Sequence, residues 1–595
     1  CYANVPYRIR PLEALLADNK NTVYYADDLA AKIEERVSSI GADGKLVLDA
    51  GGAVYQVNLL EKLLVAMLAK LGNLVVDGGI WLNTQRPEWN DANNALVGQG
   101  LSAVTLYYLR RYITFLRELL SGEAPEIELS AEVRDWLGET AAALARLRPL
   151  LGGDPITAKQ RYAALVELGQ SASHYRETVY AQESYSGKAT ASLDQVFTLL
   201  DDALAAIDHS IANNVRPDGM YHAYNTLNLQ GEALEIETLY PMLEGQVAAL
   251  SSGAVNPGEA VAVLEALFAS EVYRPDQHSF MLYPDRKLPR FLEKNSIPAA
   301  NVAGIALVGK MLGAGDERII TRDADGQHRF SANFANVSDL NAQLDALVDK
   351  YGDDVEAARQ TLSRLFEDTF DHQAFTGRSG TMFGFEGLGC IYWHMVSKLL
   401  LAVQENFYLA IEQGADKETC QQLGSLYYRV REGIGFNKTP AEYGAFPTDP
   451  YSHTPKHSGA RQPGMTGQVK EEVLSRFGEL GIRVSNGAAR FHPDLLRRRE
   501  FVAETRTFCY LDLDGEWQDL EVPASGLAFT WCQVPVIYQL DDGAKPAVTA
   551  TLDDGNTQVF DDLSLPAAMS SEVFRRSGRI RQLTVTIASD DLFTE

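Results

Sequence analysis

Cysteine is scarce in this sequence. The five cysteines are far apart, form no CxxC pair and lie in no Cys/His cluster of zinc-ligand spacing; they are Cys1, Cys390, Cys420, Cys509 and Cys532. The pattern therefore indicates neither a disulfide framework nor a zinc site. Such usage is typical of a reducing compartment, and we expect a cytoplasmic protein.

Basic residues are also few relative to acidic ones. The sequence has 53 Lys plus Arg against 80 Asp plus Glu, which gives a formal net charge of −27. This charge repels nucleic acids and anionic membrane surfaces. A neutral partner, such as a sugar, fits the composition better.

Long apolar runs and a secretory signal are missing. The most apolar stretch, residues 63–76, is interrupted by Lys70 and Gly72, and a membrane span needs about 18 apolar residues or more. We expect a soluble chain. The sequence does not begin with Met, so we expect Cys1 to lie inside a longer polypeptide; a lipidated Cys1 is the alternative.

No repeat of fixed period is present, but amphipathic helices are frequent. Apolar residues recur at spacings of three and four in 57–72, 101–120, 191–213, 258–270, 337–349, 354–368, 388–413 and 417–431. Each such helix needs a neighbour to bury its apolar stripe. We predict a mainly α fold, an (α/α)6 helical toroid with a small C-terminal β-sheet domain; an α-solenoid is the rival architecture, which the missing repeat disfavours.

Strand-like segments are concentrated near the C-terminus. They are RTFCYLDL, LAFTWCQVPVIYQL, AVTATL and QLTVTIA, separated by DGEW, DDGAK and DDGN turns. We predict a catalytic barrel over 1–500, incomplete at its N-terminus and carrying helical insertions at about 120–370, followed by a β-domain over 501–595.

The first segment whose residue types could carry out catalysis is QRPEWNDANNALVG, residues 85–98. A carboxylic acid can protonate the leaving oxygen of a glycosidic bond, and an adjacent aromatic ring can pack on a sugar and raise the pKa of that acid. Asp91 beside Trp89 meets this requirement. The alternative is that Asp91 caps the next helix while Trp89 fills the core.

Two later segments are rich in groups that bind anions or line sites. Residues 451–467, YSHTPKHSGARQPGMTG, combine hydroxyl, imidazole and glycine N–H groups before a predicted helix, an arrangement that suits phosphate. Residues 377–394 end in His394 on a largely apolar helix. Taken alone, residues 451–467 are more typical of a solvated loop than of a phosphate site, and His394 is more typical of a core histidine.

Taken in their order along the chain, the three segments resemble the inverting phosphorylases of glycoside hydrolase family 94, over roughly residues 75–495. RPEWNDANNALVGQG is similar to the family's D-W-N-D-G-x-N-x-V-G segment, GCIYWHMVSKLLLA to its phosphate-contacting helix, and DPYSHTPKHSGARQPGMTGQVKE to its later Thr-Gly loop. The stretch ELGIRVSNGAARFHPDLL resembles the family's entry into its C-terminal sheet.

The resemblance implies specific roles. Asp91 would be the general acid, with Glu88, Trp89 and Asn90 lining the sugar site and Glu386 binding the acceptor sugar. Glu88 stands where the family has Asp. The resemblance assigns phosphate to a set of four residues: His394, His453, Thr466 and Gly467.

The sequence departs from the family pattern in two ways. Asp91 and His394 are further apart than the family pattern leads us to expect, which is why we predict insertions at about 120–370 that carry substrate specificity. The family's arginine-rich donor-binding motif has no counterpart in residues 1–85. An N-terminal half or a second chain would supply it; a homodimer is a further expectation that the sequence leaves open.

The implied reaction is phosphorolysis of β-linked gluco-oligosaccharides, or its reversal, giving a sugar 1-phosphate. Inorganic phosphate is then a co-substrate, and no metal or organic cofactor is expected. One alternative is an inverting hydrolase on the same scaffold, with Glu386 or Glu442 as base. Another is an inactive carbohydrate-binding protein.

Overall fold

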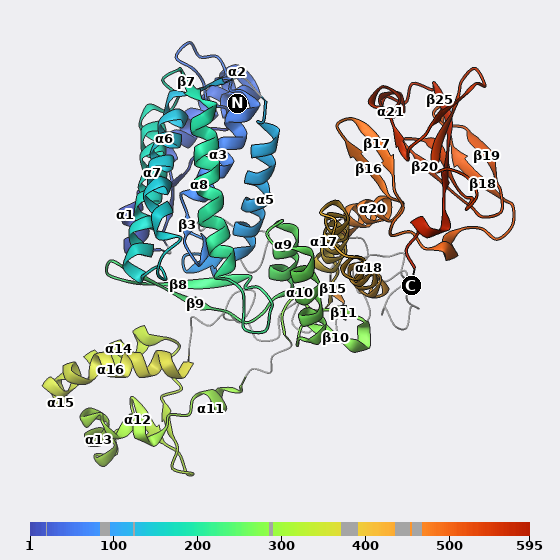
Figure 1. Cartoon of the computed structure of the whole chain (residues 1–595). Coiled ribbons are helices and arrows are strands. Elements are labelled where there is room, and N and C mark those ends of the chain that lie inside the picture. Colours follow the sequence, from blue (N-terminus) through green and yellow to red (C-terminus); the bar gives the residue numbers. More distant parts are fainter. Residues whose placement is uncertain are drawn as a thin grey trace.

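The computed structural model describes residues 1–19, 21–83, 96–122, 125–284, 289–370, 391–434, 453–454 and 467–594. Figure 1 shows a helical bundle at the N-terminus, a smaller central group of helices, a separate helical unit from residues near 300–370, and a C-terminal β-rich part. Seven of the eight predicted helices are confirmed, with shifts of up to five residues at their ends.

These helices have the following bounds: α3 (Leu59–Leu71), α5 (Ala103–Leu119), α8 (Leu193–Ala212), α10 (Pro257–Ala269), α16 (Asp353–Phe370), α17 (Trp393–Glu412) and α18 (Lys417–Glu432). Side chains cap several of them; Asn58, for example, accepts a bond from the backbone N–H of Glu61. The predicted helix 337–349 is divided into α14 (Val337–Asp345) and α15 (Val348–Tyr351).

The N-terminal bundle consists of α3, α5, α6 (Ala131–Leu147), α7 (Ala158–Gln182) and α8. At one end lies the hairpin of β6 (Glu126–Ser130) and β7 (Lys188–Ser192). The first residues of the chain add β1 (Tyr7–Ile9), α1 (Leu12–Ala17), β2 (Val23–Tyr25) and α2 (Asp27–Ile40).

The other end of the bundle carries an antiparallel five-stranded sheet (Figure 1). Its strands, in spatial order, are β3 (Leu74–Val75), β4 (Gly79–Trp81), β5 (Gly100–Ser102), β8 (Tyr224–Gln230) and β9 (Ala233–Thr238).

The prediction of a mainly α toroid with one small sheet domain is therefore wrong. Helices account for about 49% and strands for about 21%, and strands also occur throughout the N-terminal half. Three strands of the five-stranded sheet have only two or three residues, too few to show an alternating pattern in the sequence.

The central helices α9 (Leu243–Ser251), α17 and α20 (Gly467–Glu479) run parallel to α5. Arg111 on α5 forms a two-pronged ion pair with Glu405 on α17 (2.8 and 2.9 Å), and Arg110 donates to the Ser252 carbonyl at the end of α9 (3.0 Å). Later residues of α17 contact later residues of α20, so these two helices are parallel as well: Gln404 donates to the Ser475 carbonyl and Tyr408 to the Gly478 carbonyl. The N-termini of these helices therefore lie at one end.

Residues 289–370 form a unit with its own apolar core, around buried residues such as Leu340, Leu362 and Phe366. The unit contains α11 (Phe291–Lys294), α12 (Ala299–Ala303), α13 (Ala306–Gly313), β12 (Ile320–Arg322), β13 (His328–Phe330), α14, α15 and α16. Figure 1 shows it set apart from the N-terminal bundle and the C-terminal part.

The C-terminal part has its own apolar core, whose buried residues extend from Leu480 to Leu592. Its main sheet has the order β20 (Gly526–Trp531), β21 (Val534–Leu540), β25 (Ile580–Ile587), β22 (Ala547–Leu552), β23 (Thr557–Phe560). Smaller pairings join β16 (Ile482–Ser485) to β17 (Ala488–Phe491), and β18 (Arg506–Leu511) to β19 (Trp517–Val522). The strand predictions are confirmed, but LAFTWCQVPVIYQL is two strands joined at Cys532 and Gln533, both with positive φ. The domain division at residue 500 stays a prediction.

Candidate active site

The N-termini of α5, α9, α17 and α20 lie at one end of these parallel helices, and those of α5 and α9 contact Ala223, next to strand β8 of the five-stranded sheet. The N–H groups of Ala103 and Val104, at the start of α5, donate to the Ala223 carbonyl (3.0 and 3.1 Å), and a Cβ on Gly245, in α9, would lie 2.9 Å from Ala223. Helix N-termini carry partial positive charge and unpaired N–H groups. Neither α17 nor α20 has an acidic residue in its first turn, so the starts of these two helices favour an anion.

Two of the sequence-predicted phosphate segments meet at this end. Strand β14 (Ile391–Tyr392) pairs antiparallel with β15 (His453–Thr454), in the register Ile391 with Thr454 and Tyr392 with His453. Ile391 also bridges Met281. His394 follows directly, in the first turn of α17, and is 6% exposed.

Gly467 is the first residue of α20, which runs parallel to α17. The structure thus brings the chain at His394, His453 and Gly467 to one end of the parallel helices. The other predicted site residues lie outside the described residues: Glu88, Trp89, Asn90, Asp91, Glu386 and Thr466. Glu442, the alternative base, does too.

The described residues that flank the Asp91 segment are held beside each other. Gly98 N–H donates to the Leu82 carbonyl (2.6 Å), Leu82 N–H to the Gly100 carbonyl (2.9 Å), and the Trp81 indole to the Gly98 carbonyl (2.8 Å). Asn83, the last described residue before the Asp91 segment, and Leu96, the first described residue after it, therefore both lie beside the antiparallel pair of β4 and β5, near the start of α5.

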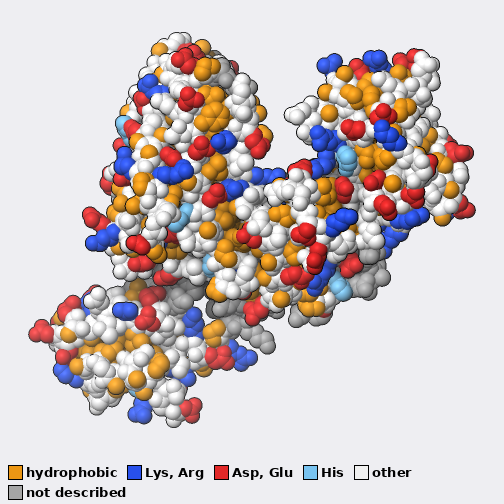
Figure 2. All heavy atoms as spheres, in the orientation of Figure 1, with side chains coloured by type: hydrophobic (Ala, Val, Ile, Leu, Met, Phe, Trp, Pro, Cys, Tyr) orange, Lys and Arg blue, Asp and Glu red, His pale blue; other side chains and the backbone are white. Residues whose placement is uncertain are grey.

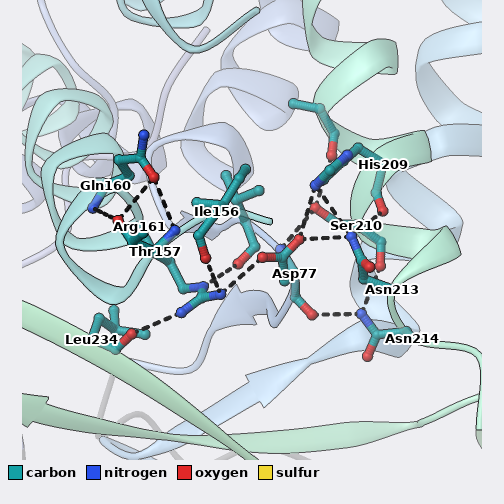
Figure 3. A network of polar contacts seen from close by, with 12 residues as sticks. Asp77, Ile156, Thr157, Gln160, Arg161, His209, Ser210, Asn213, Asn214 and Leu234 are labelled. Carbon is teal, nitrogen blue, oxygen red and sulfur yellow. Dashed lines mark hydrogen bonds and ion pairs between the residues drawn. The ribbon is translucent and has the colours of Figure 1, made fainter. Parts of the chain in front are cut away.

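A polar network fixes the turn that precedes this hairpin (Figure 3). Asp77, with φ of 68°, lies between Arg161 of α7 and His209 of α8, at 2.9 and 3.1 Å. Arg161 also donates to the carbonyls of Val76, Ile156 and Leu234.

The same turn is bound from α8 by further donors. Asn213 donates to the Asp77 carboxylate (3.0 Å), and Asn214 donates to the Asp77 carbonyl (2.8 Å). Asn225 of β8 donates to the Gly78 carbonyl (2.7 Å). Together with the bonds of Arg161 and His209, these bonds connect α7 and the end of α8 to β8, β9 and the turn before β4, and so fix where β4 begins.

Sequence reasoning missed a carboxylate at the common end of the helices. Glu244 lies in the first turn of α9, and the hydroxyl of Tyr224, which is 2% exposed, donates to it at 3.0 Å. The only local signal is an acidic residue near a helix start, which is also the usual composition of a solvated helix terminus.

A buried histidine close by was missed as well. His222 is 7% exposed and lies 3.4 Å from the Arg216 guanidinium. Burial, together with the charge of Arg216, lowers the pKa of His222 to about 4. His222 is therefore neutral near pH 7, and its backbone carbonyl accepts the Tyr107 hydroxyl at 2.7 Å.

A groove lies at the C-terminal halves of the parallel helices, away from the end just described. It has a volume of about 690 Å³ and is lined by residues that include Arg111, Phe115, Tyr408, Leu474 and Arg483. Figure 2 shows the hollow between the N-terminal bundle and the C-terminal part. Within the described ranges, no group of three or more His, Cys, Asp or Glu side chains could hold a metal ion, and no helix is long and apolar enough to cross a membrane.

Comparison with known families identifies one part of the chain. Residues 288–373 match the family described as GH149 phosphorylase insertion domain 2. The match supports a glycoside phosphorylase family, although not family 94 specifically. No curated protein matches the chain.

The matched segment corresponds to the separate helical unit with its own core. It falls almost wholly inside the range of 120–370 in which the sequence predicts inserted helices. That the insertion carries substrate specificity stays a prediction.

Proposed function

We propose that this protein is an inverting glycoside phosphorylase that acts on β-linked gluco-oligosaccharides and releases a sugar 1-phosphate. The match of residues 288–373 to a phosphorylase insertion domain supports the reaction class. The observation that carries the proposal for this site is the pairing of Tyr392 with His453, which joins the two phosphate-type segments beside His394.

The proposed reaction is a single displacement. Phosphate, bound by His394, His453, Thr466 and Gly467, attacks the anomeric carbon while Asp91 protonates the departing oxygen. The carbon–oxygen bond to the leaving sugar breaks as the bond to phosphate forms, which inverts the configuration. Phosphate itself is the nucleophile, so no second carboxylate is needed to activate water.

The surroundings suit this chemistry. Backbone N–H groups and helix N-termini bind phosphate through charge-assisted hydrogen bonds. Trp89, Glu88, Asn90 and Glu386 complete the proposed sugar site. The reaction uses phosphate as co-substrate without a metal or organic cofactor, and we place it in the cytoplasm, consistent with the cysteine usage.

The test is release of sugar 1-phosphate from a panel of β-linked glucose oligosaccharides, with and without inorganic phosphate, using the longest native polypeptide that contains this chain. We expect phosphate-dependent release of the α-anomer of the sugar 1-phosphate. Phosphate-independent release of reducing sugar would instead identify a hydrolase, and release of the β-anomer would overturn inversion.

A further inference from the structure

Three consecutive residues at the start of α9 bind one segment of chain, residues 221–224. Glu244 accepts the Tyr224 hydroxyl (3.0 Å), and Gly245 packs so tightly on Ala223 that a Cβ there would lie 2.9 Å from its backbone nitrogen. The side chain of Gln246, fully buried, accepts from the Tyr221 N–H and donates to the Tyr221 carbonyl, both at 2.8 Å.

The opposite side of the same helix start is fixed as well. Leu243 N–H donates to the Leu282 carbonyl (2.8 Å), and the adjacent Met281 bridges Ile391. Ile391 belongs to β14, whose partner β15 contains His453, and His394 follows in the next element. Glu244 therefore lies at the same end of the parallel helices as the segments proposed to bind phosphate.

Glu244 is not needed to attach the helix. The two bonds of Gln246 and the close contact of Gly245 already fix α9 to the segment 221–224. Glu244 itself is only partly buried, and the Tyr224 hydroxyl orients its carboxylate. A preoriented, partly exposed carboxylate is well suited to accept hydrogen bonds from hydroxyl groups of a ligand.

Aromatic rings lie close by in the chain. Tyr240 precedes α9 and Tyr283 follows the Leu282 contact, and their rings meet edge to face at 6.4 Å between centroids. Tyr283 is buried (6% exposed), so it supports the half-buried Tyr240, which precedes Glu244 by four residues. A carboxylate that accepts hydroxyls, together with a ring that can pack on C–H faces, is a combination that recognises a sugar.

From this geometry we infer that Glu244 is a sugar-binding carboxylate of the active site, and that Tyr224 is the residue that positions it. The inference rests on the proposed function and extends it to a residue on α9. Glu244 accepts hydrogen bonds from hydroxyls of the oligosaccharide, while phosphate is bound by the other segments. Removing its negative charge should then weaken use of the sugar and leave use of phosphate intact.

The test compares Glu244→Gln, Tyr224→Phe and the control Glu235→Gln, an exposed glutamate on β9. With sugar and phosphate varied in turn, Glu244→Gln should lower kcat/KM for the oligosaccharide at least about tenfold, the loss expected for a hydrogen bond to a charged group. The KM for phosphate should stay within about twofold. Tyr224→Phe should lower kcat/KM for the oligosaccharide by a smaller factor, again without changing the KM for phosphate. A purely structural role would instead change the kinetic constants for both substrates alike.

Direct binding separates this inference from the proposed function. Oligosaccharide binding without phosphate is measured by calorimetry for the same variants, with thermal unfolding to confirm folding. If the wild type releases sugar 1-phosphate and Glu244→Gln has the same kcat/KM for the oligosaccharide and the same sugar affinity, the inference is overturned while the proposed function stands. If wild type releases none, the proposed function fails; weaker sugar binding by Glu244→Gln then still supports the inference, and equal binding, or none by wild type, overturns it.

Discussion

Tyr392 and His453 are register partners in the antiparallel pair β14–β15, although they come from segments far apart in the sequence. This pairing fixes the second phosphate-type segment beside the start of α17, where His394 lies. A strand pair and a helix start thus converge where an anion would be stabilised by the helix N-terminus.

Replacing Asp91 by Asn is expected to lower kcat about 10²- to 10⁴-fold, because the amide cannot deliver the proton that the leaving oxygen needs. Oligosaccharide binding should persist, since the volume hardly changes. The measurement is sugar 1-phosphate release together with calorimetric sugar binding, and Asp325→Asn, in an exposed turn, is the control. A fully active Asp91→Asn would remove Asp91 from the reaction.

Replacing His394 by Gln is expected to raise the KM for phosphate about tenfold or more, as for loss of a hydrogen bond to a charged group. The KM for oligosaccharide should change little. Initial rates at varied phosphate concentration test this, with His174→Gln, an exposed histidine of α7, as the matched control. Thr466→Val should act in the same direction; an unchanged phosphate dependence in both would exclude these residues from the phosphate site.

Replacing Asp77 by Asn is expected to lower the free energy of unfolding by about 3 kcal/mol, because it leaves the poorly exposed Arg161 guanidinium without its carboxylate. Asn accepts the positive φ of this position, so backbone strain does not contribute. Urea unfolding measures the change. Glu183→Gln, which breaks the exposed pair with Lys32, should cost less than about 1 kcal/mol; equal losses in the two variants would contradict a special role for the Asp77 network.

The free energy of unfolding is expected to fall as the pH decreases from about 6.5 to 4, in part because of His222. Its pKa in the folded protein is about 4, below the value of about 6.5 in an unfolded chain, so the unfolded state takes up the proton first. The stabilisation is present above pH 6.5 and is lost as the pH falls through the folded value.

His222→Gln should reduce this pH dependence, measured by urea unfolding at a series of pH values. Above pH 7 the free energies of unfolding of the wild type and the variant should change with pH in parallel, which provides an internal control. Identical slopes between pH 6.5 and 4 would show that His222 does not titrate as its burial beside Arg216 implies.

The long helices were predictable because their signal is local. In α5 and α8 each turn repeats the same apolar spacing, and capping residues such as Ser102 and Ser192 lie at the ends. The hairpin of β20 and β21 was predicted as one strand because Cys532 and Gln533 adopt positive φ without the Gly or Asn that normally marks such a turn.

The sequence by itself determined the amphipathic helices, the strands near the C-terminus and the helical placement of His394, because each depends on contacts within a few residues. Only the tertiary structure decided that β3, β4, β5, β8 and β9 form one sheet, that Tyr392 pairs with His453, and that Glu244 lies at the same end of the parallel helices. Strands of two or three residues and a single acidic residue carry no periodic pattern. Their positions are set by long-range hydrogen bonds and packing, which form only when distant parts of the chain meet.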